Sequence, residues 1–210
     1  MRAPLEGIRV LDVSRVLAGP FCTMILGDLG AEVIKVEEPR VGDGTRAWGP
    51  PFIKGESAYF LSINRNKKSI TVNLKHPKGR EIIYKLAEKS DVFIENFRPG
   101  VAERLGVDYE AISKVNPKII YCSISGFGQT GPYRDKPAYD LLIQAMSGLM
   151  SFTGEPGRPP VRIGVAIMDL GAGMYAAISI LAALRAREIT GKGQRIDISL
   201  LDTAVSWLTY

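Results

Sequence analysis

The chain has 210 residues, of which 46% are hydrophobic and 23% are charged, and its formal net charge is +5. This composition is typical of a globular protein with a sizeable core and excludes an intrinsically disordered chain. The lysines and arginines are scattered rather than grouped in a basic tract, so the positive charge favours an anionic small molecule over nucleic acid as the ligand.

Segments with strand and helix patterns alternate through the first two thirds of the chain. Strands are predicted at 8–14, 32–37, 69–74, 91–95 and 119–124, and helices at 18–30 and 77–89. Loops rich in Pro and Gly are expected at 39–55 and 126–137. Strands that alternate with helices of this length predict an α/β fold with a doubly wound, mostly parallel sheet.

The last third contains a predicted helix at 139–149, a turn-rich connection at 153–160, a long apolar helix at 170–184 and a strand at 194–199. The apolar helix is shorter than the roughly 20 residues of a membrane span, so we expect it to be buried in the core. Residues 1–7 lack the apolar segment of a secretory signal. These features predict a cytoplasmic protein that does not bind a membrane.

Cysteine and histidine are scarce in this sequence. Cys22 and Cys122 lie far apart in apolar surroundings, and we expect reduced core thiols. His76 is the single histidine, so neither a Ser-His-Asp triad nor a His-rich metal site is expected.

The loop after the first strand, 14–20, leads directly into a helix. Ligands of open parallel sheets bind beyond the carboxyl ends of the strands, and a helix N-terminus suits a phosphate group. The loop has neither the G-x-G-x-x-G fingerprint nor the Walker A pattern, so an ordinary NAD site or P-loop is not predicted. A tight turn at Gly19-Pro20 that merely starts the helix is the simpler interpretation of this loop on its own.

Asp169 is the one charged residue in an otherwise uncharged run that opens the long apolar helix. An ionised carboxylate is expensive to bury without partners, so its presence needs a reason. It is either the N-cap of the helix or a poorly hydrated carboxylate that acts as a nucleophile. Gly171 and Gly173, expected in the first helical turn, indicate that another group approaches the backbone closely.

Several short motifs together resemble the class III coenzyme A transferases, a family that includes formyl-CoA transferase, carnitine-CoA transferase and α-methylacyl-CoA racemase. The resemblance covers essentially the whole chain. The motifs that carry it are 10–14 (VLDVS), 18–20 (AGP), 29–37 (LGAEVIKVE), 42–43 (GD), 66–70 (NKKSI), 95–100 (ENFRPG), 125–128 (SGFG), 131–132 (GP), 144–148 (QAMSG) and the run around Asp169.

The resemblance implies a Rossmann-like large domain and a covalent mechanism. Members of the family move CoA from an acyl-CoA donor to a carboxylic acid acceptor, and the aspartate that matches Asp169 attacks the thioester. A mixed anhydride and then an aspartyl-CoA thioester follow, which conserves the thioester energy without a metal or a permanently bound cofactor. Backbone amides near Gly171 or Ala18 are candidate donors to the oxyanions.

The resemblance also implies the residues that contact CoA. Val16 and Ala18 match the segment that lines the thiol arm and diphosphate. Arg40 falls near an adenine-side arginine, with Glu38 as the alternative aligned position. The remaining phosphate, ribose and adenine contacts are expected from Lys75, Asn96, Phe97, Arg104 and Lys136. For each of these a solvated or structural role is the alternative.

Two departures from the family bear on function. Tyr139 stands where the racemase branch has a histidine, which favours a transferase over a racemase, although Tyr139 stays a candidate CoA contact. Members are also about twice as long, so residues 1–210 match the large domain, and the small second domain and the C-terminal return are expected to be absent. Three hypotheses follow: a CoA-transferase, an acyl-CoA racemase or isomerase, and a non-catalytic CoA-binding fragment. Full activity is expected to require the missing half or a partner chain, and the interlocked homodimer of the family is expected once the missing half is supplied.

Overall fold

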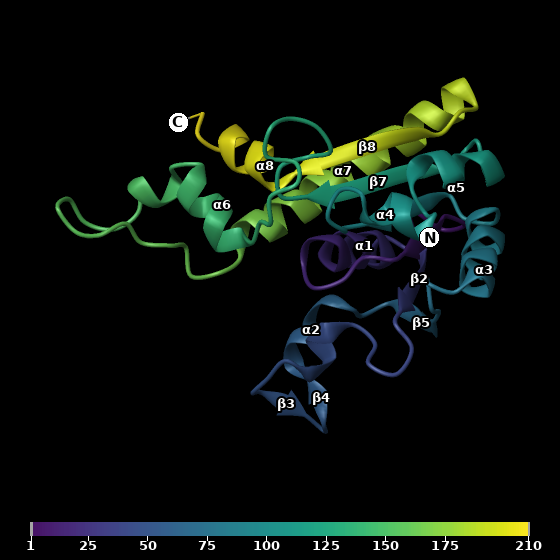
Figure 1. Ribbon diagram of the computed structural model, residues 1–210, viewed down its shortest axis with the longest axis horizontal. Helices are drawn as coiled ribbons and strands as arrows, with labels where there is room; N and C mark the ends of the chain where they lie inside the picture. Colours follow the sequence, from purple (N-terminus) through teal and green to yellow (C-terminus); the bar gives the residue numbers. More distant parts are fainter. Residues whose placement is uncertain (1, 210) are drawn as a thin grey trace.

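A computed structural model describes residues 2–209 and contains a six-stranded sheet in which every neighbouring pair of strands is parallel (Figure 1). The strand order is β5-β2-β1-β6-β7-β8. The strands are β1 (Arg9–Asp12), β2 (Glu32–Glu37), β5 (Lys67–Thr71), β6 (Val92–Glu95), β7 (Ile120–Ser125) and β8 (Gln194–Ser199). The predicted α/β class and doubly wound sheet are confirmed.

Helices cover both faces of this sheet. On one face α1 (Ala18–Asp28), α7 (Ile167–Thr190) and α8 (Leu200–Ser206) pack against Val10, Ile94 and Cys122. On the other face α3 (Pro77–Ala87), α4 (Val101–Leu105) and α5 (Tyr109–Val115) cover Leu11, Phe93 and Tyr121. Because successive side chains of a strand point to opposite faces and both faces are covered, all residues of β6 and β7 are buried, and only Glu95, Ser123 and Ser125 among them are polar.

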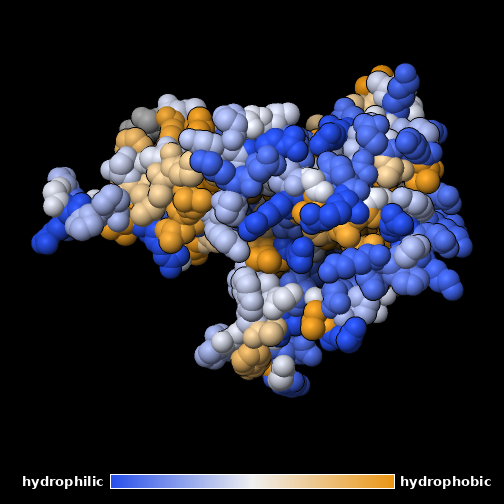
Figure 2. All heavy atoms as spheres, in the orientation of Figure 1, coloured by the Kyte–Doolittle hydropathy of each residue, from blue (hydrophilic) through white to orange (hydrophobic). Residues whose placement is uncertain are grey.

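Two segments project from the sheet layer (Figure 1). One follows β2 and contains the 3₁₀ turn η1 (Gly44–Ala47), the small hairpin β3 (Phe52–Ile53) and β4 (Glu56–Ser57), and α2 (Ala58–Ile63). The other contains α6 (Asp140–Met146), the 3₁₀ turn η2 (Leu149–Ser151) and the loop that leads to α7. Figure 2 shows hydrophobic side chains gathered over the second projection.

Helix α7 is the central helix of its layer. By length and composition its 24 residues could cross a membrane, but half of its most apolar window is buried inside the protein. Gly171 and Gly173 are buried where α7 meets α8 and α1. The predicted core helix is confirmed, although it starts three residues earlier and ends later than the sequence pattern indicates.

Several elements differ from the sequence prediction. The strand predicted at 69–74 lies at Lys67–Thr71, where it pairs with β2. The loop predicted at 39–55 contains η1 and β3, and α2, α4, α5 and α8 were not predicted. These helices have five to seven residues, too few to display a helical period, and they depend on packing against the sheet.

Candidate functional site

The loops after β1 and β6 meet at the centre of the sheet. The strand order reverses between these two neighbouring strands, which is where open α/β sheets bind ligands. Asn96 joins the loops, because its Oδ1 accepts a hydrogen bond from the Arg15 amide (2.9 Å) and its Nδ2 donates to the Arg15 carbonyl (2.6 Å). The Arg15 guanidinium lies 5.4 Å from the centre of the Phe97 ring.

A pocket of about 330 Å³ opens beside this junction. It lies at the carboxyl ends of β1, β2, β5 and β6, and its walls combine apolar side chains with charged ones. The lining residues are Val13, Arg15, Val36, Glu37, Glu38, Val72, Asn73, Leu74, Lys75, Phe97 and Leu105. Lys75 and Phe97 were predicted ligand contacts, and Arg15 was not.

The loop from β1 to α1 passes from this pocket toward α7. Val16 has a φ of +71°, and Ala18 is the first residue of α1. No side chain caps the start of α1 in the described chain, so no side chain occupies the amides of Ala18 and Gly19. The Ala18 carbonyl oxygen lies 2.7 Å from the position that a Cβ on Gly173 would take, so α1 and α7 are in backbone contact here.

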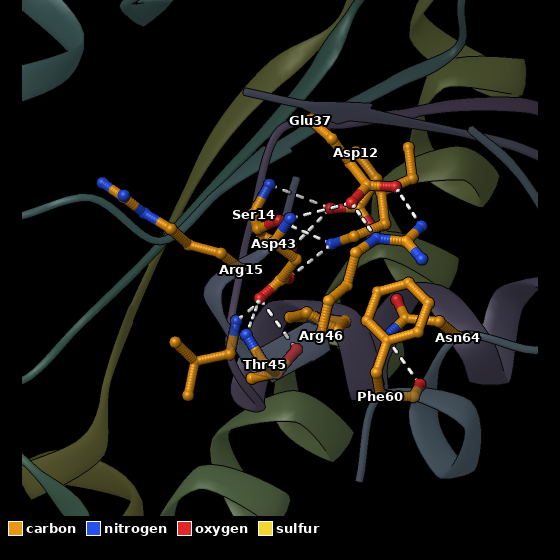
Figure 3. A network of polar contacts seen from close by, with 12 residues as sticks. Asp12, Ser14, Arg15, Glu37, Asp43, Thr45, Arg46, Phe60 and Asn64 are labelled. Carbon is orange, nitrogen blue, oxygen red and sulfur yellow. Dashed lines mark hydrogen bonds and ion pairs between the residues drawn. The ribbon is translucent and has the colours of Figure 1, made fainter. Parts of the chain in front are cut away.

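A buried network of polar contacts holds the loop between β1 and α1 in place (Figure 3). Asp43 accepts hydrogen bonds from the Val16 amide (3.3 Å) and from the amide and hydroxyl of Thr45, and it pairs with Lys35 at 2.9 Å. Glu37 in turn accepts from the Asp43 amide and from Arg46 in a bidentate pair. Although burial opposes ionisation, these contacts lower the pKa of Glu37 to about 2.

Asp12 forms the second centre of this network. It accepts hydrogen bonds from the amide and hydroxyl of Ser14 and from Thr23, and its carboxylate lies 3.3 Å from Lys67 Nζ. Burial lowers the pKa of Lys67 to about 8, while Asp12 opposes that shift. Lys35 donates to the Ser14 carbonyl, which links the two centres.

Asp169 is the third residue of α7, and Ala166 occupies the N-cap position. The interpretation of Asp169 as the N-cap is therefore wrong. Within residues 2–209 the structure gives its carboxylate no hydrogen bond or ion pair. Burial, with a smaller contribution from the charge of Asp140, raises the pKa of Asp169 to about 7. A carboxylate that is poorly solvated and unpaired is one that can react as a nucleophile.

The cap of α7 comes from α6. Asp140 is buried, and its Oδ1 accepts a hydrogen bond from the Met168 amide (2.7 Å). Gln144 is completely buried one turn later; its Nε2 donates to Asp140 Oδ2, and its Oε1 accepts from the Ile163 amide (2.9 Å). Asp140 and Gln144 thus fix both the start of α7 and the loop before it, and hence the position of Asp169.

The structure does not bring all predicted contacts together. Arg40 and Arg104 are exposed and do not line the pocket, and Lys136 stacks on Tyr133 with 3.9 Å between Nζ and the ring centre. Tyr139 precedes α6 and is 77% exposed. The contacts of these side chains with a ligand stay predictions.

The two glycines of α7 have a structural explanation. They lie in the second turn rather than the first, so the amide of Gly171 belongs to the helical hydrogen-bond ladder, whereas Ala18 is the first residue of α1 and its amide precedes the ladder of that helix. A Cβ on Gly171 would lie 2.6 Å from Trp207, and one on Gly173 would meet Ala18 and Phe21. The close approach inferred from the sequence is confirmed, and the approaching groups are α8 and α1.

Comparison with known proteins shows which family the chain resembles. The sequence profile of a family described as CoA-transferase family III matches residues 5–210. Succinyl-CoA:glutarate CoA-transferase of Mus musculus is 58% identical over 98% of the chain and 47% of its own length. Acetyl-CoA:oxalate CoA-transferase of Acetobacter aceti is 49% identical over 100% of the chain and 54% of its own length.

A solved structure of a CAIB/BAIF family protein from Brucella suis superimposes with a TM-score of 0.96 and 49% sequence identity, covering 100% of this chain and 56% of that one. The chain thus spans about half the length of the curated relatives it matches.

Proposed function

Because this chain belongs to CoA-transferase family III, we propose that it carries the nucleophile of an enzyme that moves coenzyme A from an acyl-CoA donor to a carboxylic acid acceptor. The observation that carries the proposal is the state of Asp169. It stands at the start of a core helix, is held there by Asp140 and Gln144, and has a pKa raised to about 7 by burial.

The proposed reaction regenerates this carboxylate in each cycle. Asp169 attacks the thioester carbonyl carbon, the carbon–sulfur bond breaks, and CoA thiolate leaves a mixed anhydride. The thiolate then attacks the aspartyl carbonyl, which releases the donor acid and forms an aspartyl-CoA thioester. The acceptor carboxylate attacks that thioester, and the thiolate finally attacks the acceptor's acyl carbon. Product acyl-CoA leaves, Asp169 is again a carboxylate, and no thioester energy is lost to hydrolysis.

The surroundings of Asp169 suit this chemistry. Weak solvation makes its carboxylate a better nucleophile than an exposed aspartate. The uncapped amides at the start of α1 are candidate donors to the oxyanion that forms at each attack. Asp140 disfavours a second negative charge nearby, which helps the release of carboxylate products.

For CoA itself we propose the pocket at the carboxyl ends of β1, β2, β5 and β6. Lys75 and Phe97 line it, and Asn96 anchors its edge. Arg40, Arg104 and Lys136 are proposed to reach phosphate groups from the rim, and the loop of Val16 and Ala18 leads from the pocket toward α7.

This assignment of the ligand predicts a salt-sensitive affinity. Phosphate contacts by exposed cations are screened at high ionic strength, so Lys75→Ala and Arg104→Ala should each weaken CoA binding about three- to tenfold at low salt, and less at 0.5 M salt. Titration calorimetry measures this. Lys114→Ala, which removes an exposed cation from α5, is the control that should leave affinity unchanged. Equal losses in all three variants would contradict the assignment.

The acceptor is proposed from the names of relatives. Glutarate and oxalate transferases are both among them, so we propose a short dicarboxylic acid as acceptor. Succinyl-CoA offered with glutarate, oxalate or a monocarboxylic acid of matched length tests this. Preference for the monocarboxylic acid would contradict it.

A racemase is the second candidate, because Asp140 and Asp169 form an interacting pair of carboxylates and the pKa of Asp169 is near 7. Such a group can act as a general acid or base. A racemase would exchange the α-proton of acyl-CoA with deuterium from the solvent without any acceptor acid, whereas the transferase would not.

The decisive experiment follows the covalent adduct. The complete protein is incubated with acyl-CoA and its intact mass is measured, with Asp169→Ala as the test variant. We expect an adduct on the wild type and none on the variant, which should also lose CoA transfer. Asp202→Asn changes an exposed acid in the first turn of α8 and should keep both. Transfer by Asp169→Ala at the wild-type rate would exclude the mechanism, and CoA binding without any adduct would favour a non-catalytic CoA-binding role.

We also propose the assembly and location that the family implies. The complete protein is an interlocked homodimer in the cytoplasm, and the second half of each site comes from segments outside these residues, either in the same polypeptide or in a partner chain.

A further inference from the structure

The loop between β1 and α1 adopts a backbone conformation that its sequence disfavours. Val16 has a φ of +71°, and this left-handed region is sterically poor for a β-branched side chain. Such strain persists only where the surrounding structure enforces it, and it is concentrated at ligand sites. The enforcing contact is the hydrogen bond from the Val16 amide to Asp43 Oδ2.

Asp43 is itself rigidly held. Its Oδ1 accepts from the amide and hydroxyl of Thr45, and its Oδ2 pairs with Lys35 Nζ at 2.9 Å. Lys35 also donates to the Ser14 carbonyl at 3.0 Å. The ion pair therefore bonds to the loop at both Ser14 and Val16 (Figure 3). Lys35 and Asp43 are 1% and 4% exposed. A buried ion pair is weak evidence of stabilisation, so its presence here calls for another role.

The strained residue lies between the two parts of the proposed site. Arg15, on one side of it, lines the pocket. Ala18, on the other side, contacts α7 at Gly173, one turn after Asp169. Tyr59 on α2 lies within electrostatic reach of both Asp43 and Asp169, whose charges add to the effect of burial in raising its pKa to about 12. A ligand that extends from the pocket to Asp169 must pass over this loop.

We propose that Asp43, fixed by Lys35, is a positioning residue that holds Val16 in the left-handed conformation and thereby shapes the surface along which the arm of acyl-CoA reaches Asp169. The identity of the ligand rests on the proposed function, whereas the control of the loop by Asp43 does not.

The first experiment measures CoA affinity in a double-mutant cycle. Glycine adopts positive φ without strain, so Asp43 should matter less when residue 16 is glycine. We expect Asp43→Asn to weaken CoA binding about tenfold in the natural background and at most threefold when combined with Val16→Gly. Asp28→Asn, which breaks an exposed pair with Arg65, should leave affinity unchanged. The same tenfold loss in both backgrounds would overturn the proposal.

The second experiment needs no ligand. In hydrogen exchange, Asp43→Asn should remove the protection of the Val16 amide and keep that of the Phe21 amide, which bonds to the Leu17 carbonyl. Unchanged protection of Val16 would overturn the proposal. If the wild type had no affinity for CoA, the proposed function would fail, and this measurement would still decide whether Asp43 controls the loop.

The third experiment does not depend on the folding of an Asp43 variant. Because glycine relieves the strain at residue 16, Val16→Gly should leave the midpoint of thermal unfolding unchanged or raise it. Val165→Gly, at a half-exposed position in the loop before α7, is the control. It shows the effect of replacing valine by glycine at an unstrained position and should lower the midpoint. An equal decrease in both variants would show that Val16 is not strained and would overturn the proposal.

Discussion

A carboxylate in the first turn of a helix is ordinarily stabilised in its ionised form by the helix dipole. Asp169 is in such a turn, yet burial raises its pKa from 3.8 to about 7. Between about pH 4 and 7, Asp169 therefore keeps its proton in the folded protein, whereas the unfolded chain has already released it. The free energy of unfolding falls as the pH rises through this interval. The reactive residue is thus maintained at the expense of stability.

Replacement of this residue should reveal that effect. Asp169→Asn has no charge to desolvate, so we expect it to be more stable than the wild type by about 1–3 kcal/mol at pH 8, with the difference vanishing near pH 4. Urea unfolding at several pH values measures this. Asp202→Asn, at an exposed first-turn position, should show no such dependence. A variant that is less stable than the wild type at pH 8 would contradict the desolvation of Asp169.

Single residues show what could be predicted from the sequence. Asp169 was identifiable because it is the one charge in an apolar run. Its cap was not, because Asp140 lies 28 residues before Met168 and reaches it only in the folded chain. Asp43 belongs to a family motif and could have been predicted as a site residue for that reason. Its contact with Val16, and the positive φ of Val16, are known only from the structure.

At the scale of elements, α6 determines how α7 begins. Gln144→Leu removes the hydrogen bonds to Asp140 Oδ2 and to the partly buried Ile163 amide, and both atoms lose these partners, although Asp140 Oδ1 keeps its bond from the Met168 amide. Each such group costs about 1–3 kcal/mol. We expect a loss of about 2–4 kcal/mol in unfolding free energy, together with a slower rate of Asp169 acylation, as measured by urea unfolding and intact mass.

Gln194→Leu, at an exposed position on β8, is the matched control and should change stability by less than about 0.5 kcal/mol. If Gln144→Leu acylated at the wild-type rate, α6 would have no part in positioning the nucleophile.

Helices α1 and α7 can cross closely because Gly173 has no side chain. A Cβ on Gly173 would lie 2.7 Å from the Ala18 carbonyl oxygen, so Gly173→Ala must push the start of α1 away. We expect a destabilisation of about 1–3 kcal/mol, as for other overpacked cores, and weaker CoA binding because α1 carries the ligand loop. Gly164→Ala, where nothing lies within 4 Å, should change neither stability nor affinity. Retention of both properties in Gly173→Ala would contradict the close crossing.

Elements were predictable where the hydrophobic pattern was long or continuous. The buried strands β6 and β7 and the helix α7 have such patterns. The segment from η1 to α2 does not, because its two-residue strands and six-residue helix are defined by each other and by Arg46, which stacks on Phe60 at 3.8 Å.

The whole molecule exposes large hydrophobic side chains around α6 and along α7. Large hydrophobic side chains are exposed on α6 and on the loop after it, where Figure 2 shows hydrophobic side chains, and others are exposed on α7. They include Leu141, Leu142, Met146, Phe152, Met174 and Ile178. Patches of this kind mark surfaces that another segment or chain covers.

The chain studied by itself should therefore associate. We expect light scattering to show species heavier than a monomer, and Ile178→Lys, at a position that is 61% exposed, to shift them toward the monomer. Ile82→Lys, an exposed replacement on α3, is the control and should leave association unchanged. A stable monomer of the unmodified chain would show that this surface needs no cover.

The pairing of α1 with α7 has a consequence for synthesis on the ribosome. Strands β1, β2 and β5 are neighbours and can pair early, but α1 must wait for α7, which is translated after β7. Until then the apolar side of α1, including Cys22 and Leu26, has no covering helix. From the synthesis of α1 until that of α7 the nascent chain therefore exposes this apolar surface, and transiently exposed surfaces of this kind are prone to aggregation.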